Sequence, residues 1–124
     1  MGNTERIETK NCFVWTRVST KHQEENGGSL DHQRTLCEEY AKEHGLTIKG
    51  YFGGKHESAK TPGALINNML KTVKKDKSIK YILISEFDRF SRNSGQAINI
   101  LNDLTACGIV VIACKTGQDT RDKN

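Results

Sequence analysis

Short apolar runs alternate with amphipathic segments along the whole chain. Apolar and β-prone stretches predict β-strands at residues 12–17, 46–52, 80–85 and 109–114. The near-continuous apolar character of the first predicts a strand that is covered on both faces, as in a parallel sheet. Apolar side chains at helical spacing predict three helices between them: one from Ser29 to Gly45, one starting at Pro62, and one over residues 96–104. This alternation predicts an α/β fold, with a three-layer, doubly wound, mainly parallel sheet.

The polar segments set the expected domain boundaries. Residues 1–10 lack periodicity and are expected to form a disordered tail, whereas residues 11–120 contain every predicted strand and helix. The last residues, 115–124, are polar and are not expected to fold. Four aromatic side chains on the apolar stripes and strands are expected in the core, namely Trp15, Tyr40, Tyr51 and Tyr81.

Composition narrows the class of protein. The chain has 124 residues, a formal net charge of +4 and 27% charged residues, which fits a single globular domain and permits, without requiring, a nucleic-acid partner. Its longest apolar run is too short to cross a bilayer, and its start lacks the apolar core of a signal peptide, so we expect a cytoplasmic protein with no membrane partner. The four cysteines are irregularly spaced, without a C-x-x-C pair, and are expected to be small buried or half-buried side chains and not metal ligands.

Three polar clusters follow the predicted strands. Parallel sheets bind ligands at the carboxyl ends of their strands, so we expect the clusters to meet there. Guanidinium groups bind phosphoryl oxygens and would neutralise the charge that develops on a phosphate under attack by a serine. The pattern therefore predicts phosphoryl transfer without a metal ion or another cofactor. The clusters are Arg17 with Ser19, the loop over residues 53–60, and the group Asp88, Arg89 and Arg92.

Other polar residues have simpler interpretations. Gln33 falls in the second turn of the helix from Ser29, and the pattern alone favours a solvated helix position for it. Lys74, Lys75 and Lys77 close the next helix, where positive charge complements the helix dipole. His22 lies three residues after Ser19, but no oriented carboxylate accompanies it in sequence, which favours a loop surface over a Ser–His pair.

Three motifs together resemble the catalytic domain of the serine recombinases, the resolvase/invertase family. They are Arg17-Val-Ser19, the helix start Ser29-Leu-Asp-His-Gln33, and Asp88-Arg89-Phe-Ser-Arg92. Each motif alone is weak, but all three occur in order on the predicted elements, and the resemblance covers roughly residues 12–120. It implies a resolvase-like, flavodoxin-like arrangement of the sheet.

The resemblance also implies a reaction. Ser19 would attack a DNA phosphodiester, forming a 5′-phosphoserine intermediate and freeing a 3′ hydroxyl, before strand exchange and religation without metal or ATP. Double-stranded DNA would be the partner, with a homodimer or tetramer formed by the full-length protein and a monomer or weak dimer by an isolated domain. The implied roles are phosphate binding by Arg17, Arg89 and Arg92, orientation of these arginines or proton transfer by Asp88, and support of the site by Gln33.

The chain departs from the family pattern in two places. Family members usually carry an acidic residue after the second strand and an arginine before the following helix, whereas no arginine occurs here between Arg34 and Arg89. Glu57 and Lys60 are expected to replace them in a substrate-binding loop that includes Ser58, although a lysine lacks the bidentate fork of arginine. The chain also stops, at residues 121–124, about where the family's dimerisation helix begins. We therefore expect an excised catalytic domain without the DNA-reading domain.

Two other functions fit the same pattern. One is a catalytically weakened recombinase-like module, kept for protein contacts or DNA tethering. The other is a hydrolase or phosphatase on a flavodoxin-like fold, which would act on small phosphoesters without DNA.

Overall fold

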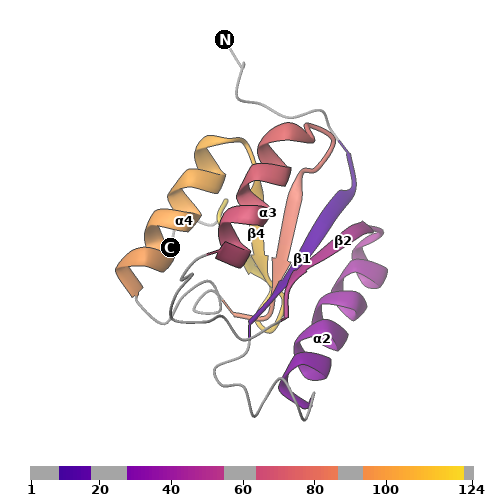
Figure 1. Cartoon of the computed structure of the whole chain (residues 1–124). Coiled ribbons are helices and arrows are strands. Elements are labelled where there is room, and N and C mark those ends of the chain that lie inside the picture. Colours follow the sequence, from indigo (N-terminus) through magenta and orange to yellow (C-terminus); the bar gives the residue numbers. More distant parts are fainter. Residues whose placement is uncertain (1–8, 18–27, 55–63, 87–93, 122–124) are drawn as a thin grey trace.

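The computed structural model describes residues 9–17, 28–54, 64–86 and 94–121 (Figure 1). In these ranges a five-stranded sheet has the order β2-β1-β3-β4-β5. β1 to β4 pair in parallel, and β5 pairs with β4 in the antiparallel sense. The predicted mainly parallel sheet is therefore confirmed. The strands are β1 Asn11–Thr16, β2 Thr47–Gly53, β3 Tyr81–Ile84, β4 Val110–Ala113 and β5 Gln118–Asp119.

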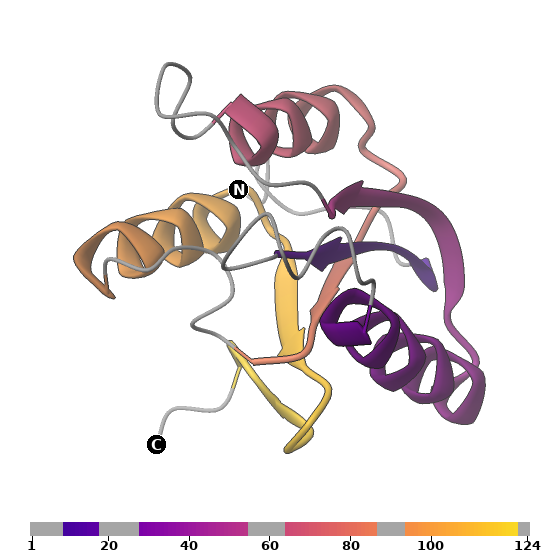
Figure 2. The same cartoon turned by 60° about the horizontal axis from the view of Figure 1, so that its bottom comes forward.

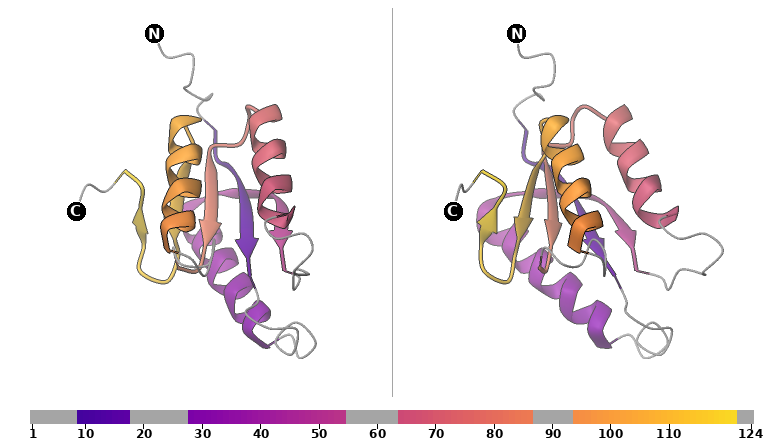
Figure 3. Two further views of the ribbon diagram at one scale, coloured as in Figure 1. Left: turned by 60° about the vertical axis from the view of Figure 1, so that its left-hand side comes forward. Right: turned by 90° about the vertical axis from the view of Figure 1, so that its left-hand side faces the viewer.

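Helices cover both faces of the sheet, as predicted. α2 (Gly28–His44) lies on one face, and α3 (Ala64–Lys75) and α4 (Ser94–Ala106) lie side by side on the other. Figure 3 shows α3 and α4 in front of the strands with α2 behind them, and Figure 2 turns the carboxyl ends of the strands toward the reader. Because β1 to β4 are parallel, each helix starts at the carboxyl edge of the sheet and returns the chain to the amino edge.

Two apolar clusters fill the space on either side of the sheet. In β1, Cys12 and Val14 pack toward α2, where Cys37 is also fully buried. Phe13 and Trp15 belong to the cluster on the opposite face, together with buried residues of α3 and α4. This alternation is the period-2 pattern of a strand that is covered on both faces. Trp15 is 3% exposed, which confirms its predicted packing in the sheet.

Both predicted polar ends are more structured than expected where the structure describes them. The Thr9 hydroxyl donates to the Ser78 carbonyl at 2.7 Å, and the Thr47 N–H donates to the Lys10 carbonyl at 2.8 Å. At the other end, the expectation that residues 115–124 do not fold is wrong for residues 115–121. A turn through Gly117, with φ +80°, leads into β5, and Thr120 exchanges two hydrogen bonds with the backbone of Val111.

Two further expectations concern single side chains. The cysteines are free thiols, with Cys12 and Cys37 buried and Cys107 and Cys114 half-buried, as predicted. The prediction that Tyr51 is a core residue is wrong: it is 49% exposed, because β2 is an edge strand and has a neighbouring strand on one side only. Its hydroxyl donates to a Glu38 carboxylate oxygen at 2.7 Å.

Among the described helices, none is long and apolar enough to cross a membrane.

Candidate active site

The end of β1 is held by a glutamine side chain from α2. The Arg17 N–H donates to Gln33 Oε1 at 3.0 Å, and Gln33 Nε2 donates to the Arg17 carbonyl at 2.8 Å. The oxygen and the nitrogen of the Gln33 amide therefore both bind the backbone of the same residue. The amide replaces a neighbouring strand at the point where β1 ends, and it fixes the position of Arg17, which is half-buried.

Gln33 reaches this position because of the register of α2. Leu30 and Cys37, three residues before it and four residues after it, are both buried, so Gln33 lies on the face that packs on the sheet. It is 1% exposed, and the solvated helix position that the pattern favoured is wrong. A polar residue in the middle of an apolar stripe was the signal for this role. Burial of an amide is tolerable only where its hydrogen bonds are made.

The neighbouring strand ends in a tight glycine turn at the same edge. Thr16 pairs with Gly53, and the Gly54 N–H donates to the Thr16 carbonyl at 3.0 Å. Gly53 and Gly54 have φ of +79° and +78°, a conformation that residues with a Cβ rarely adopt. A Cβ on Gly53 would overlap the Thr16 carbonyl oxygen and crowd the Trp15 ring. The two glycines therefore allow the backbone at the end of β2 to approach the end of β1 closely.

An arginine that the sequence reasoning did not select also lies at this edge. Arg34 follows Gln33 on α2, and its Nη2 atom is 3.2 Å from the place where a Gly54 Cβ would be. The Thr16 Oγ1 atom is 3.3 Å from that same place. Arg34 is half-buried. The signal that could have found it is its helical position, since the first turns of α2 start from the carboxyl edge of the sheet.

β3 brings a buried hydroxyl to the same level. Val14 pairs with Leu83, so Thr16 and Ser85, each two residues further on, lie at corresponding points of β1 and the chain after β3. Ser85 is 2% exposed, and its Oγ has no hydrogen-bond partner among the described residues. Next to it, Glu86 and Lys115 form an exposed ion pair with an N–O distance of 3.9 Å.

Most of the predicted catalytic residues lie outside the described part of the chain. Arg17 and Gln33 are described and are brought together by direct hydrogen bonds. The other predicted site residues lie outside the described residues, in the ranges 18–27, 55–63 and 87–93, so their convergence remains a prediction. They are Ser19, Glu57, Ser58, Lys60, Asp88, Arg89 and Arg92. The ends of β1, β2 and β3, from which these ranges continue, lie next to one another in the sheet.

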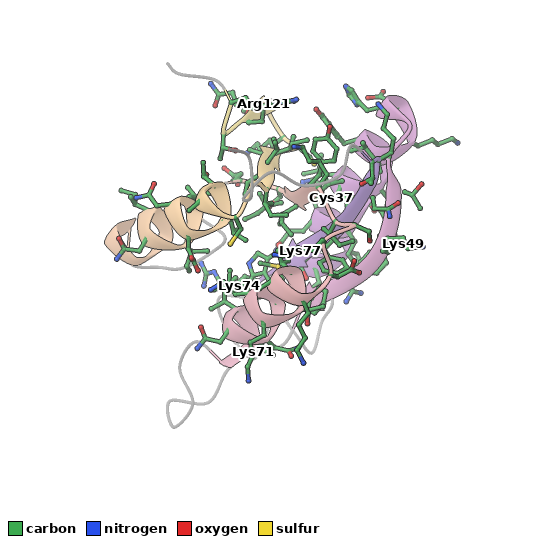
Figure 4. The ribbon with its side chains drawn as sticks, turned by 90° about the horizontal axis from the view of Figure 1, so that it is seen from above. Cys37, Lys49, Lys71, Lys74, Lys77 and Arg121 are labelled. Atoms are coloured by element: carbon green, nitrogen blue, oxygen red, sulfur yellow. The ribbon has the colours of Figure 1, made fainter. Side chains whose placement is uncertain are left out.

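The lysine cluster lies at the opposite end of the domain. Lys74 and Lys75 are in the last turn of α3, and Lys71 lies one turn earlier (Figure 4). Lys74 Nζ is 3.4 Å from an Asp103 carboxylate oxygen of α4, and both side chains are largely exposed. These lysines meet the carboxyl end of a helix dipole at the amino edge of the sheet, so the structure does not bring them to Arg17. In the described ranges, no group of three or more histidine, cysteine or acidic side chains is arranged to hold a metal ion.

The fold and this edge define an α/β domain whose parallel strands end at a buried amide, a paired glycine turn and two arginines. Residues 12–124 match the family model described as Resolvase, N terminal domain, which is nearly the whole chain. The chain therefore belongs to this family, and its fold is that of the catalytic domains of serine recombinases. Among curated proteins, none matches the chain.

Solved structures of recombinases have the same fold. A resolvase family site-specific recombinase from Streptococcus pneumoniae is 26% identical with a TM-score of 0.78, over 91% of this chain and 78% of that one. The N-terminal catalytic domain of TP901-1 integrase is 20% identical with a TM-score of 0.72, over 91% of this chain and 83% of that one. The C-terminal catalytic domain of ISC1926 TnpA, an IS607-like serine recombinase, is 19% identical with a TM-score of 0.66, over 84% and 67% of the two chains. The last two likenesses concern the fold alone.

Proposed function

We propose that this chain is the catalytic domain of a site-specific serine recombinase that cuts and rejoins double-stranded DNA. The observation that carries the proposal is the pair of hydrogen bonds between Gln33 and the Arg17 backbone. They fix the chain two residues before Ser19, at the edge where parallel sheets bind their ligands. Membership of the resolvase family supports the same reaction.

In the proposed reaction, Ser19 Oγ attacks a DNA phosphorus atom. The new P–Oγ bond forms as the bond from phosphorus to the 3′ oxygen breaks. The serine hydroxyl gives up one proton and the 3′ oxygen takes up one, so that it leaves as a hydroxyl and the step is neutral in protons. Religation reverses these steps with the 3′ hydroxyl of another strand. The phosphoserine keeps the energy of the broken bond, so that religation needs no external energy source.

Arginines supply the electrostatic part of the proposal. Arg17, Arg89 and Arg92 bind the oxygens of the scissile phosphate and stabilise the charge that develops there. Asp88 orients these arginines or assists proton transfer, and Gln33 is a positioning residue that acts through Arg17. Glu57, Ser58 and Lys60 contact the substrate next to the reacting phosphate. Assembly into a dimer or tetramer and a cytoplasmic location remain predictions of the same proposal.

The test is capture of the covalent intermediate. The chain is mixed with a pool of nicked duplex oligonucleotides, because a nick lets the cut strand diffuse away and prevents religation. We expect an adduct that survives denaturing electrophoresis, that carries a phosphoserine at Ser19 on mass spectrometry, and that the S19A variant does not form. The matched control is S78A, a serine at the amino edge of the sheet, which should form the adduct normally.

Two results would replace the proposal. DNA binding without any adduct would favour the weakened module that tethers DNA or a protein. Turnover of p-nitrophenyl phosphate in the absence of DNA, lost in S19A, would favour a phosphatase on the same fold.

A further inference from the structure

Arg34 presents a cation at the carboxyl edge on the α2 side of the sheet. Its Nη2 atom lies 3.2 Å from the position that a Gly54 Cβ would occupy, so the guanidinium lies beside the space that a side chain at Gly54 would fill. The absence of a side chain at Gly54 is what leaves room for it. Gln33, the preceding residue, bonds the Arg17 backbone. Two consecutive residues of α2 therefore reach the ends of two neighbouring strands, β1 and β2.

The Arg34 guanidinium has no direct partner in the described part of the chain. No ion pair or hydrogen bond joins its guanidinium to another described residue. Two acids of the same helix lie one turn away, Asp31 three residues before Arg34 and Glu38 four residues after it. Neither forms an ion pair with Arg34 in the described part of the chain, and one Glu38 carboxylate oxygen accepts the hydrogen bond of the Tyr51 hydroxyl. Arg34 is half-buried, and a cation that is partly removed from water is stabilised by an anion at hydrogen-bond distance.

We propose that Arg34, beside the glycine turn at Gly54, forms a second phosphate-binding subsite, which holds a DNA phosphate beside the one that reacts. Naming DNA as the polyanion rests on the proposed function, whereas the subsite itself rests on the geometry of Arg34, Thr16 and Gly54. Thr16 Oγ1 and Arg34 Nη2 lie 3.3 Å and 3.2 Å from the same point beside Gly54, the place of its missing Cβ, and Thr16 directly precedes Arg17. The subsite therefore lies beside the residue that precedes Arg17, at the same edge of the sheet.

A purely structural role for Arg34 makes a different prediction. If the guanidinium only stabilises the glycine turn or the Tyr51–Glu38 pair, its loss lowers the stability of the fold. The salt dependence of DNA affinity then stays unchanged. If Arg34 binds a phosphate, the R34A variant makes one phosphate contact fewer, so about one counterion fewer is released from the DNA on binding. The salt dependence of DNA affinity separates these two roles, because its slope counts phosphate contacts.

The experiment measures binding of a fluorescent duplex of random sequence by anisotropy at several NaCl concentrations. It uses the S19A background, so that no covalent step contributes. We expect R34A to bind several-fold more weakly at low salt and to reduce the slope of log K against log [NaCl] by about one. R34K should keep the slope and lose part of the affinity, since lysine keeps the charge without the fork. The control K42A, at the far end of the same helix, should leave affinity and slope unchanged.

Two results would overturn the subsite: an R34A slope equal to that of the unchanged chain, or no salt-dependent duplex binding by the unchanged chain. A second measurement is independent of DNA. In nuclear magnetic resonance spectra, titrated inorganic phosphate should shift the Arg34 Nε–Hε resonance saturably, and an unmoved resonance would also reject the proposal. The adduct assay fails or succeeds separately, so loss of the recombinase reaction with retention of the R34A effect would leave the subsite intact.

Discussion

Gln33 acts on Arg17 as an adjacent strand would, by accepting from its N–H and donating to its carbonyl through one side chain. The carboxyl end of β1 is thereby joined to α2 by hydrogen bonds, in addition to the apolar packing of Leu30 and Cys37. A buried side-chain amide that satisfies both groups of one residue makes the position of that residue specific, since any shift breaks both bonds at once.

Replacing Gln33 tests this relationship directly. Q33A should lower the free energy of unfolding by about 2–4 kcal/mol, because two backbone groups of Arg17 lose the hydrogen bonds that Gln33 makes to them, at a cost of about 1–3 kcal/mol each. The measurement is urea denaturation followed by circular dichroism. T35A, an exposed position on the same helix, should change stability by less than about 0.5 kcal/mol. A loss below about 1 kcal/mol in Q33A would show that water replaces the amide without penalty.

The two glycines of the β2 turn should respond differently to alanine. G53A should lose about 3 kcal/mol or more, because the new methyl group meets the Thr16 carbonyl and the rigid Trp15 ring in addition to an unfavourable φ. G54A should lose about 1–2 kcal/mol, since its methyl group meets the movable end of Arg34. Thermal denaturation of the two variants in parallel checks the order. Equal losses would mean that φ strain alone decides both.

The buried hydroxyl of Ser85 predicts a stabilising substitution. S85A should raise the free energy of unfolding by about 1 kcal/mol, because it removes a polar group that is buried without a partner among the described residues. The comparison is Ser78, whose hydroxyl donates to an Asp76 carboxylate oxygen at 2.6 Å. S78A removes this hydrogen bond and should therefore lose stability. If S85A is instead destabilised, the hydroxyl has a partner in the folded protein in solution.

Tyr51 predicts a dependence of stability on alkaline pH. Its hydrogen bond to Glu38, followed by partial burial and the charge of that carboxylate, raises its pKa to about 12 from an ordinary value of 10. The unfolded state loses this proton first, so the contribution of Tyr51 is fully present below about pH 10 and is lost as the pH rises toward 12. The ultraviolet titration of tyrosinate should show a late step that Y51F abolishes and E38Q moves to lower pH. A late step that survives in Y51F would assign it to another tyrosine.

The cysteines should separate into two reactive classes. Burial, with a smaller contribution from Cys114, raises the pKa of Cys12 to about 12, and a hydrogen bond with Cys114, together with burial, raises the pKa of Cys37. Because the thiolate is the nucleophile, both should resist iodoacetamide at neutral pH while the half-buried Cys107 and Cys114 react. Peptide mass spectrometry over a time course measures this. Labelling of Cys12 as fast as Cys107 would contradict it, and denatured protein provides the control in which all four react.

The order of strands and helices was predictable because each element carries its own period. The buried strands around Phe13 and Ile82 are continuous apolar runs, and Gly45 ends α2 with φ +69°, as a C-terminal glycine does. β5 was missed because its two residues follow a polar turn with no period, and only pairing with β4 makes them a strand. Tyr51 was misplaced because the sequence does not say which strand lies at the sheet edge.

The candidate site was predictable as a location and only partly as a geometry. Parallel topology alone places Arg17 at the carboxyl edge. The bond from Gln33 to Arg17 joins residues that are 16 apart and depends on how α2 packs on the sheet, which local patterns do not encode. Arg34 was overlooked because its contact with Gly54 depends on the same packing and on the glycine turn.

The shared direction of the three described helices has an electrostatic consequence. Each starts at the edge where Arg17 lies, so the amino ends of α2, α3 and α4 direct their partial positive charges, about half an elementary charge each, toward that side of the sheet. This field comes from the peptide groups, does not change with pH, and survives the replacement of any single arginine. An approaching polyanion is therefore attracted to one end of the domain before any side chain touches it.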